Sequence, residues 1–209
     1  MRASGSEAEA GEPTRTVEYT EAEERQIAAQ LFAVQQDIQA GQHSTTQASP
    51  SYVIELHRQA FNGIDHAGRV RVPGWGSEHK TFGPNRSVHR SETMAQLEAS
   101  MERARRMVAS VLENPDAPDR DQHALHIAVW GHAEVIRIHP FEDGNGRTSR
   151  LLLDSMLVTM GLQPIPLETA KETYFDCLNH YFRTDDIQAL LDLFIELAGA
   201  QLLERDEEE

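Results

Sequence analysis

One stretch of the chain gathers groups that could bind a phosphate and move a proton. It runs His139–Arg150 and reads His-Pro-Phe-Glu-Asp-Gly-Asn-Gly-Arg-Thr-Ser-Arg. Pro140 disfavours helical geometry at His139, so a helix is expected to end there and the next to begin near Gly146. Two glycines and Asn145 allow left-handed conformations that turn successive N–H groups toward one point. With the positive end of the following helix, this pattern predicts an anion site, and phosphate is its usual occupant.

Charged side chains in the same stretch point to a nucleotide and a metal ion. Arg147 and Arg150 lie three residues apart on one helical face, and arginine holds phosphate oxygens with paired hydrogen bonds. Asp143 is a single carboxylate beside the loop, which suits Mg²⁺ completed by phosphate oxygens and water. His139 stands at the rim, where an imidazole can accept a proton from an incoming hydroxyl. We interpret Phe141 as a core anchor.

Each of these features alone has a plainer interpretation. A histidine at a helix end is more often structural, a Gly-Asn-Gly turn is usually only a turn, and two helical arginines are usually solvated. Their coincidence in one short stretch favours a site. Three further histidines, His123, His126 and His132, do not share one tight face and no cysteine joins them, so we predict no zinc site there.

The stretch resembles the signature of the Fic family, His-Pro-Phe-x-Asp-Gly-Asn-Gly-Arg-x-x-Arg, at every fixed position. The resemblance extends less specifically over residues 51–198, where His57, Gly68 and Arg71 fall at positions with similar residues in the family. It implies an all-helical Fic fold and a protein adenylyltransferase. Such an enzyme moves AMP from ATP to a Tyr, Thr or Ser hydroxyl of a target protein and releases pyrophosphate.

The same resemblance implies roles for individual residues. His139 would be the catalytic base, Asp143 would hold Mg²⁺ as the cofactor, and the two arginines would contact the β- and γ-phosphates. The implied ATP-binding residues are Asp143, Gly144, Asn145, Gly146, Arg147, Thr148, Ser149 and Arg150. Relatives place aromatic residues near the adenine, which indicates Tyr174 and Phe175, although core packing explains these two equally well. The family also has a flap that docks the target protein, and by analogy Lys80, Thr81, Phe82 and Gly83 would form it here. The alternative interpretation of these four residues is a plain surface loop.

Many relatives carry an inhibitory helix with Ser or Thr, three residues, Glu, and then Gly or Asn. No clean copy is present in this chain, because Glu18 follows Thr14 at the right spacing but precedes Tyr19. The alternatives are a degenerate motif using Glu18, a small antitoxin-like partner that supplies the glutamate, or an enzyme without restraint.

The sequence also predicts the helices that position these groups. Apolar spacing and capping residues predict helices over about 20–41, 51–63, 91–112, 121–139, 146–160 and 168–181, and a seventh capped by Thr184. The first of these helices is expected to be capped by Thr20 together with Glu23, and the second by Ser51. Residues 68–88, with alternating valines and several glycines, predict a small hairpin flap. The predicted fold class is therefore all-α, with one projecting β element.

The composition limits which classes of partner and which cellular compartment we expect. The 209 residues hold 19 Lys and Arg against 34 Asp and Glu, a net charge of −15, which argues against binding nucleic acid or anionic membrane. One cysteine and a polar N-terminus without a signal peptide predict a cytoplasmic protein, with delivery to another cell left open. We divide the chain into a disordered segment 1–16, an N-terminal helix and linker 17–50, a Fic domain 51–198 and an acidic tail 199–209.

Two other functions stay open. The same site could remove AMP or transfer another phosphate-linked group, although the intact Asp-Gly-Asn-Gly core favours AMP. A catalytically silent module that binds a nucleotide or a partner would have no need of both His139 and Asp143.

Overall fold

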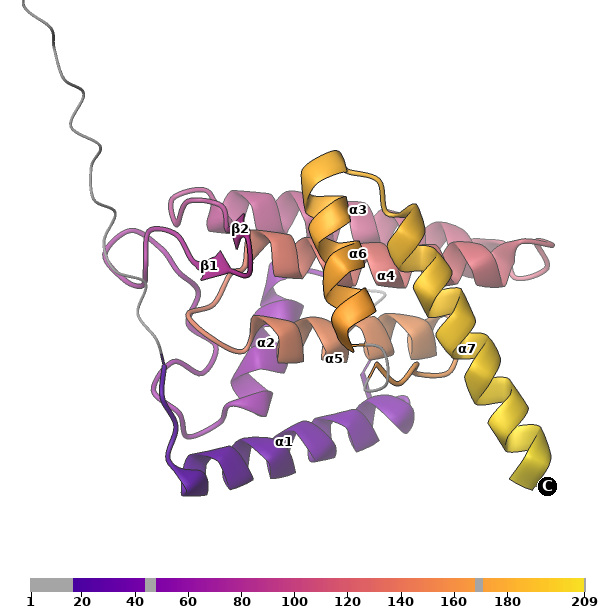
Figure 1. The fold of residues 1–209 in the computed structure, drawn as a ribbon, viewed down its shortest axis with the longest axis horizontal. Helices are drawn as coiled ribbons and strands as arrows, with labels where there is room; N and C mark the ends of the chain where they lie inside the picture. Colours follow the sequence, from indigo (N-terminus) through magenta and orange to yellow (C-terminus); the bar gives the residue numbers. More distant parts are fainter. Residues whose placement is uncertain (1–16, 44–47, 168–170, 209) are drawn as a thin grey trace, which may run out of the picture.

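The chain folds into helices with one small hairpin in the computed structural model, which describes residues 17–43, 48–167 and 171–208 (Figure 1). The all-α prediction is confirmed. The predictions for residues 1–16 and for a helix start at Glu168 lie outside the described residues. The helices are α1 (Glu21–Gln39), α2 (Pro50–Ala60), α3 (Thr93–Glu113), α4 (Arg120–Ile138), α5 (Asn145–Thr159), α6 (Lys171–Thr184) and α7 (Gln188–Glu208), and the strands are β1 (Thr81–Phe82) and β2 (Asn85–Arg86).

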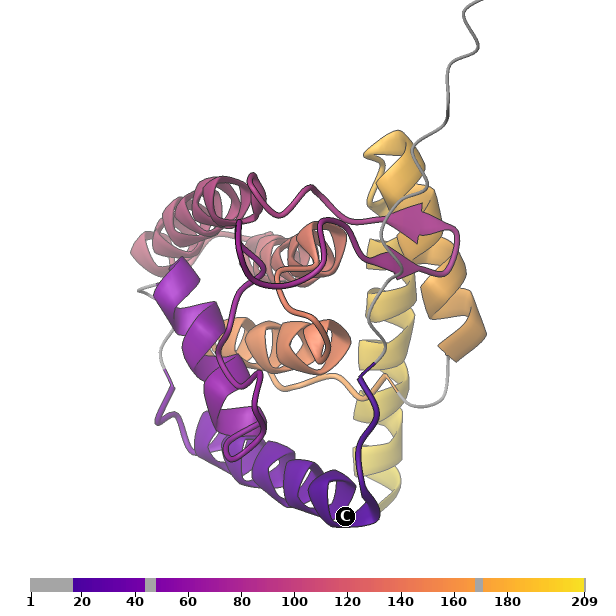
Figure 2. The same ribbon diagram turned by 90° about the vertical axis from the view of Figure 1, so that its left-hand side faces the viewer.

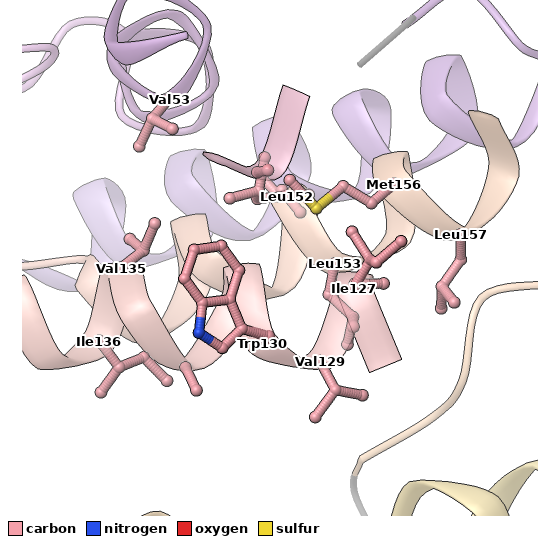
Figure 3. Close-up of a cluster of buried hydrophobic side chains, with 14 of the residues drawn as sticks. Val53, Ile127, Val129, Trp130, Val135, Ile136, Leu152, Leu153, Met156 and Leu157 are labelled. Carbon is pink, nitrogen blue, oxygen red and sulfur yellow. The ribbon is translucent and has the colours of Figure 1, made fainter. Parts of the chain in front are cut away.

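Helix α4 is the centre of the molecule. From Ala124 to Ile138 all its residues except His126 and Arg137 are buried, as expected for a helix that is covered on every side. Helix α5 packs beside α4, and the two appear nearly end-on at the centre of Figure 2, with α1, α2 and α3 around one side and α6 and α7 on the other. Figure 3 shows part of this core, to which α2 adds Val53.

Local signals explain where the first two helices begin. Thr20 and Glu23 form the predicted capping box of α1, in which each side chain bonds the backbone N–H of the other residue. The predicted cap of α2 is wrong by two residues, because Ser49 and not Ser51 accepts the bond from the N–H of Tyr52. Pro50 occupies the first helical position, where its missing N–H has no intrahelical role.

The start of α7 also differs from prediction. Thr184 belongs to the end of α6, where its hydroxyl donates to the carbonyl of His180, so it does not cap α7. Asp186 instead accepts from the N–H of Gln188 at the start of α7. Helix α7 continues to Glu208, so residues expected in an acidic tail are helical. None of the helices in the described part combines the length and apolar character needed to cross a bilayer.

The predicted hairpin lies within residues 68–88, with Thr81 opposite Arg86 and Phe82 opposite Asn85. Gly83 turns the chain with φ 54°. The hairpin rests on α6, since the Asn85 side-chain amide donates to Asn179 Oδ1 at 2.6 Å. Its base is tied to the α4–α5 connection, because Val70 forms a β-bridge with Phe141. The hairpin is thereby held beside that connection (Figure 1).

Candidate active site

The connection between α4 and α5 is a sharp turn that begins at His139. This residue has a left-handed backbone (φ 55°, ψ 60°), and its N–H bonds the carbonyl of Val135 to end α4. Pro140 accounts for the stop, since it disfavours helical geometry at the residue before it. Histidine is among the few residues other than glycine that are enriched in this region of φ. The predicted helix end is confirmed.

Gly144 ends the same turn, and no other residue fits its place. Its φ is 80°, and a Cβ atom built on it would overlap the ring of Phe61 and lie 3.2 Å from His57 Nε2. Asn145 and Gly146 do not use the left-handed conformation that their residue types allow, because α5 begins at Asn145, one residue before the predicted start. The free N–H groups of that first turn still point outward from the helix end, as an anion site requires.

Asn145 holds the turn together through its side chain. Its Oδ1 accepts from the N–H of Phe141 and its Nδ2 donates to the carbonyl of the same residue, both at 2.9 Å. The residue is 2% exposed, so its side chain serves the turn and does not face a ligand. Phe141 is fully buried and stacks on His57 with ring centroids 3.8 Å apart, which confirms it as a core anchor.

The imidazole of His139 is oriented so that one nitrogen is left to accept a proton. Its Nδ1 lies 3.1 Å from the carbonyl of Ile136, which can only accept, so Nδ1 carries the hydrogen and Nε2 has a free lone pair. The ring stacks on Phe82, with centroids 4.2 Å apart and planes 7° from parallel. Burial lowers the pKa of His139 to about 4, and the charges of Arg71 and Lys80 act in the same direction. The ring is therefore neutral at pH 7.

A nucleotide-free titration checks that protonation state. We expect the His139 ring signals of a ¹³C-histidine-labelled sample to stay constant from pH 8 to pH 5 and to shift only toward pH 4, because the lowered pKa means protonation begins below the ordinary value of 6.5. The His139→Asn variant assigns the signal by its loss. Titration of this signal near pH 6.5 would contradict the buried, neutral ring.

Arg71 joins the turn to the base of the hairpin. It is fully buried, and its backbone N–H bonds the carbonyl of Pro140 at 2.8 Å. Its guanidinium donates to five carbonyl oxygens, on His139, Ile138, Ser77, Glu78 and Val88, at 2.8–3.2 Å. Five is the full donor capacity of arginine. The residue therefore fixes the backbone of His139 relative to the hairpin.

Replacing Arg71 by lysine is expected to lower the free energy of unfolding by about 3 kcal/mol or more. Lysine has three donors and cannot span the same carbonyls, so at least two buried acceptors lose their partners, each costing about 1–3 kcal/mol. Urea unfolding measures the loss. The matched control is Arg69→Lys, an exposed arginine whose guanidinium lies over the Trp75 ring. Equal stability of the two variants would refute this role of Arg71.

Asp143 is the partly exposed carboxylate of the turn, whereas its neighbour Glu142 is buried and pairs with Lys80. Burial opposes its ionisation, but hydrogen bonds from Tyr19 and the Gly144 N–H, and the charge of Arg147, hold its pKa below the ordinary value. Its side chain is 36% exposed. Within the described ranges no group of three or more His, Cys, Asp or Glu residues could hold a metal ion alone. A lone, partly exposed carboxylate beside the free N–H groups of α5 is the kind of ligand that Mg²⁺ uses when phosphate oxygens and water complete its shell.

The two arginines of the stretch have different surroundings. Arg147 donates to Asp143 Oδ2 at 2.6 Å, and its guanidinium lies over the Phe61 ring at 4.6 Å. Arg150 is exposed and lines a cavity of about 560 Å³ together with His139 and Gly146. Both arginines also line a neighbouring cavity of about 470 Å³, bounded by α1 and residues 164–167. Arg150 thus stands between the two spaces.

Aromatic side chains close the first cavity opposite the turn. Tyr174 and Phe175 of α6 line it, and Phe82 and Gly83 of the hairpin form its rim. Tyr174 is 6% exposed and its hydroxyl lies 2.7 Å from His132 Nε2, whereas Phe175 is 50% exposed. The structure brings these four predicted residues to the same space as His139, and their roles toward adenine and target stay predictions.

Other predicted site residues lie away from this cavity. Lys80 is buried and pairs with Glu142 at 3.3 Å, so it does not lie on a docking edge. Thr148 and Ser149 are fully buried in the first turns of α5, so their side chains do not reach a nucleotide there. Thr81 and Glu18 are exposed, outside the cavity's lining. The sequence interpretation missed Tyr19, whose hydroxyl donates to Asp143, because 124 positions separate the two residues and no local pattern links them.

Comparison with known proteins identifies the family of the chain. The model of the Fic/DOC family matches residues 47–157. Protein adenylyltransferase Fic of Culex quinquefasciatus is 40% identical over 57 residues, which are 27% of this chain and 11% of that protein. The enzyme of the same name from Drosophila persimilis is 30% identical over 113 residues, 54% of this chain and 20% of that protein.

Both matches therefore span a fifth or less of these relatives. Among solved structures, the ADP-bound N-terminal Fic domain of a putative cell filamentation protein from Bartonella quintana superposes with a TM-score of 0.64. It is 16% identical and covers 88% of each chain, which supports the fold alone. With more than half of its residues matched by the family model, the chain belongs to the Fic/DOC family.

Proposed function

We propose that this chain transfers AMP from ATP to a hydroxyl group of another protein. His139 Nε2 takes the hydroxyl proton, the oxygen bonds to the α-phosphorus, and the bond from that phosphorus to the β-phosphate oxygen breaks, so that pyrophosphate leaves. The N–H groups at the start of α5 and the guanidinium of Arg150 stabilise the phosphate charge. Mg²⁺ held by Asp143 would supply further charge neutralisation on the phosphates.

The observation that carries this proposal is the placement of three groups around one cavity. The neutral ring of His139, the exposed guanidinium of Arg150 and the N-terminal turn of α5 all face the space of about 560 Å³. Tyr174 and Phe175 offer apolar surface to adenine on its far side. The β- and γ-phosphates would extend toward the second cavity, which Arg147 and Arg150 both line.

Labelled ATP tests the reaction class. We expect radioactive phosphorus from the α-position of ATP to appear on proteins of a cell lysate incubated with the purified chain and Mg²⁺. Label from the γ-position should not appear beyond the level of a lysate without the chain. Transfer from the γ-position would indicate a kinase. Tight nucleotide binding without transfer of either label would indicate a silent binding module, and loss of label from AMP-modified proteins would indicate the reverse reaction.

Arg150→Ala is expected to weaken binding of a non-hydrolysable ATP analogue by about 10- to 100-fold. The reason is the loss of charge-assisted hydrogen bonds worth about 1.5–3 kcal/mol. Because the side chain is exposed, the thermal unfolding midpoint should not change. Isothermal titration calorimetry measures the affinity, with Arg106→Ala on the exposed face of α3 as the matched control. Equal affinity of both variants would remove Arg150 from the phosphate site.

A further inference from the structure

Tyr19 reaches the candidate metal carboxylate from a segment far away in the sequence. It directly precedes Thr20, the cap of α1, and is half-buried. Its hydroxyl lies 2.5 Å from Asp143 Oδ2 and 2.8 Å from His66 Nε2. A phenol has one hydrogen, and the ionised carboxylate can only accept, so Tyr19 donates to Asp143 and accepts from His66.

The same carboxylate oxygen receives a second donor. Arg147 bonds Oδ2 at 2.6 Å, and its guanidinium lies 5.6 Å from the centroid of the Tyr19 ring. Two donors on one oxygen, from opposite parts of the chain, restrict the rotation of the carboxyl group. The Gly144 N–H also bonds this carboxylate, so the carboxyl group is held in one orientation on a side chain that is still 36% exposed.

We propose that Tyr19 is a positioning residue that orients the Asp143 carboxylate for the divalent cation that accompanies ATP. This inference rests on the proposed function, in which Asp143 is the protein's ligand to that cation. Groups that bond a metal's carboxylate ligand fix its orientation, and losing them typically lowers metal affinity about 10- to 100-fold. Tyrosine suits the task, because its hydroxyl donates a hydrogen bond without placing a positive charge beside the ion.

Tyr19 lies outside the part of the chain that matches the family model, and helix α1 holds it in place. Residues 47–157 match the family model, and the expected Fic domain of 51–198 also omits Tyr19. Helix α1 packs on α2 and α5 through the buried residues Ile27, Val34 and Ile38. Because Tyr19 lies two residues before α1, this packing fixes where its ring enters the site.

Binding of Mn²⁺ to the full chain tests the inference independently of catalysis. Electron paramagnetic resonance counts free Mn²⁺ in the presence of a non-hydrolysable ATP analogue. We expect Tyr19→Phe to weaken Mn²⁺ binding by about 10- to 100-fold, because the ring stays and only the hydroxyl is lost. The matched control is Tyr52→Phe, which removes a hydroxyl bonded to Ser155 between α2 and α5. It should leave Mn²⁺ affinity unchanged, and thermal unfolding should show both variants folded.

Three outcomes would overturn the inference, and they are distinguishable. Tighter Mn²⁺ binding by Tyr19→Phe would mean that the hydroxyl competes with the ion. Unchanged binding by Tyr19→Phe, with weakened binding by Asp143→Asn, would remove Tyr19 and leave Asp143 as the ligand. Unchanged binding by Asp143→Asn would remove the metal assignment itself, and the role of Tyr19 with it.

Discussion

Replacing His139 by asparagine is expected to lower the rate of AMP transfer by about 10²–10⁴-fold, the usual contribution of a positioned base. Asparagine also tolerates the left-handed backbone that residue 139 adopts, so the turn should survive, but its amide has no basic nitrogen. Transfer of label from the α-phosphate to lysate proteins measures the rate. Affinity for a non-hydrolysable ATP analogue should change little.

The matched control for this variant is His123→Asn, whose side chain is 60% exposed near the start of α4. It should transfer label at the wild-type rate. Circular dichroism and thermal unfolding should show both variants folded. A folded His139→Asn variant with the wild-type rate would show that another group accepts the proton.

Gly144→Ala is expected to destabilise the protein by about 2–5 kcal/mol. A left-handed φ costs an L-residue about 1–2 kcal/mol, and overpacking against the Phe61 ring adds about 1–3 kcal/mol. For a chain of this size the thermal unfolding midpoint should fall by about 4–20 °C. Since the turn carries both His139 and the start of α5, label transfer should fall with it.

The neighbouring glycine gives the contrasting variant. Gly146 is helical and no atom lies within 4 Å of a Cβ built there, so Gly146→Ala should be at least as stable as the wild type. Its methyl group would face the cavity that the glycine lines, so nucleotide affinity should fall. Wild-type stability of Gly144→Ala, or wild-type affinity of Gly146→Ala, would contradict the respective role.

Much of the fold was predictable because local signals decide it. The Thr20–Glu23 box starts α1, Pro140 ends α4, and apolar spacing marks the helices that surround α4. The two errors at helix starts have the same cause, which is a second capping residue close by. Ser51 was predicted to cap α2, but Ser49 before Pro50 does so. Thr184 was predicted to cap α7, but Asp186 bonds the N–H group at its start. Which of two neighbouring caps is used depends on packing that a local pattern does not contain.

Side-chain direction was the less predictable part of the site. Lys80 resembles a surface residue of a flap, yet it turns inward because Glu142 is buried beneath the hairpin and needs a positive partner. Thr148 and Ser149 follow an arginine in the motif, but their faces of α5 lie against the core. Tyr19 meets Asp143 only because α1 folds back onto α5. These outcomes depend on tertiary packing, which spacing along the chain does not encode.

In the proposed reaction, the start of α5 holds the phosphates of ATP while His139 faces the α-phosphorus. A crystal structure of the chain with Mg²⁺ and a non-hydrolysable ATP analogue tests it most directly. We expect the base between the hairpin and α6, the α-phosphate on the free N–H groups of α5, and His139 Nε2 directed at an open approach to the phosphorus. A nucleotide bound elsewhere, or an α-phosphate that His139 cannot approach, would contradict the account.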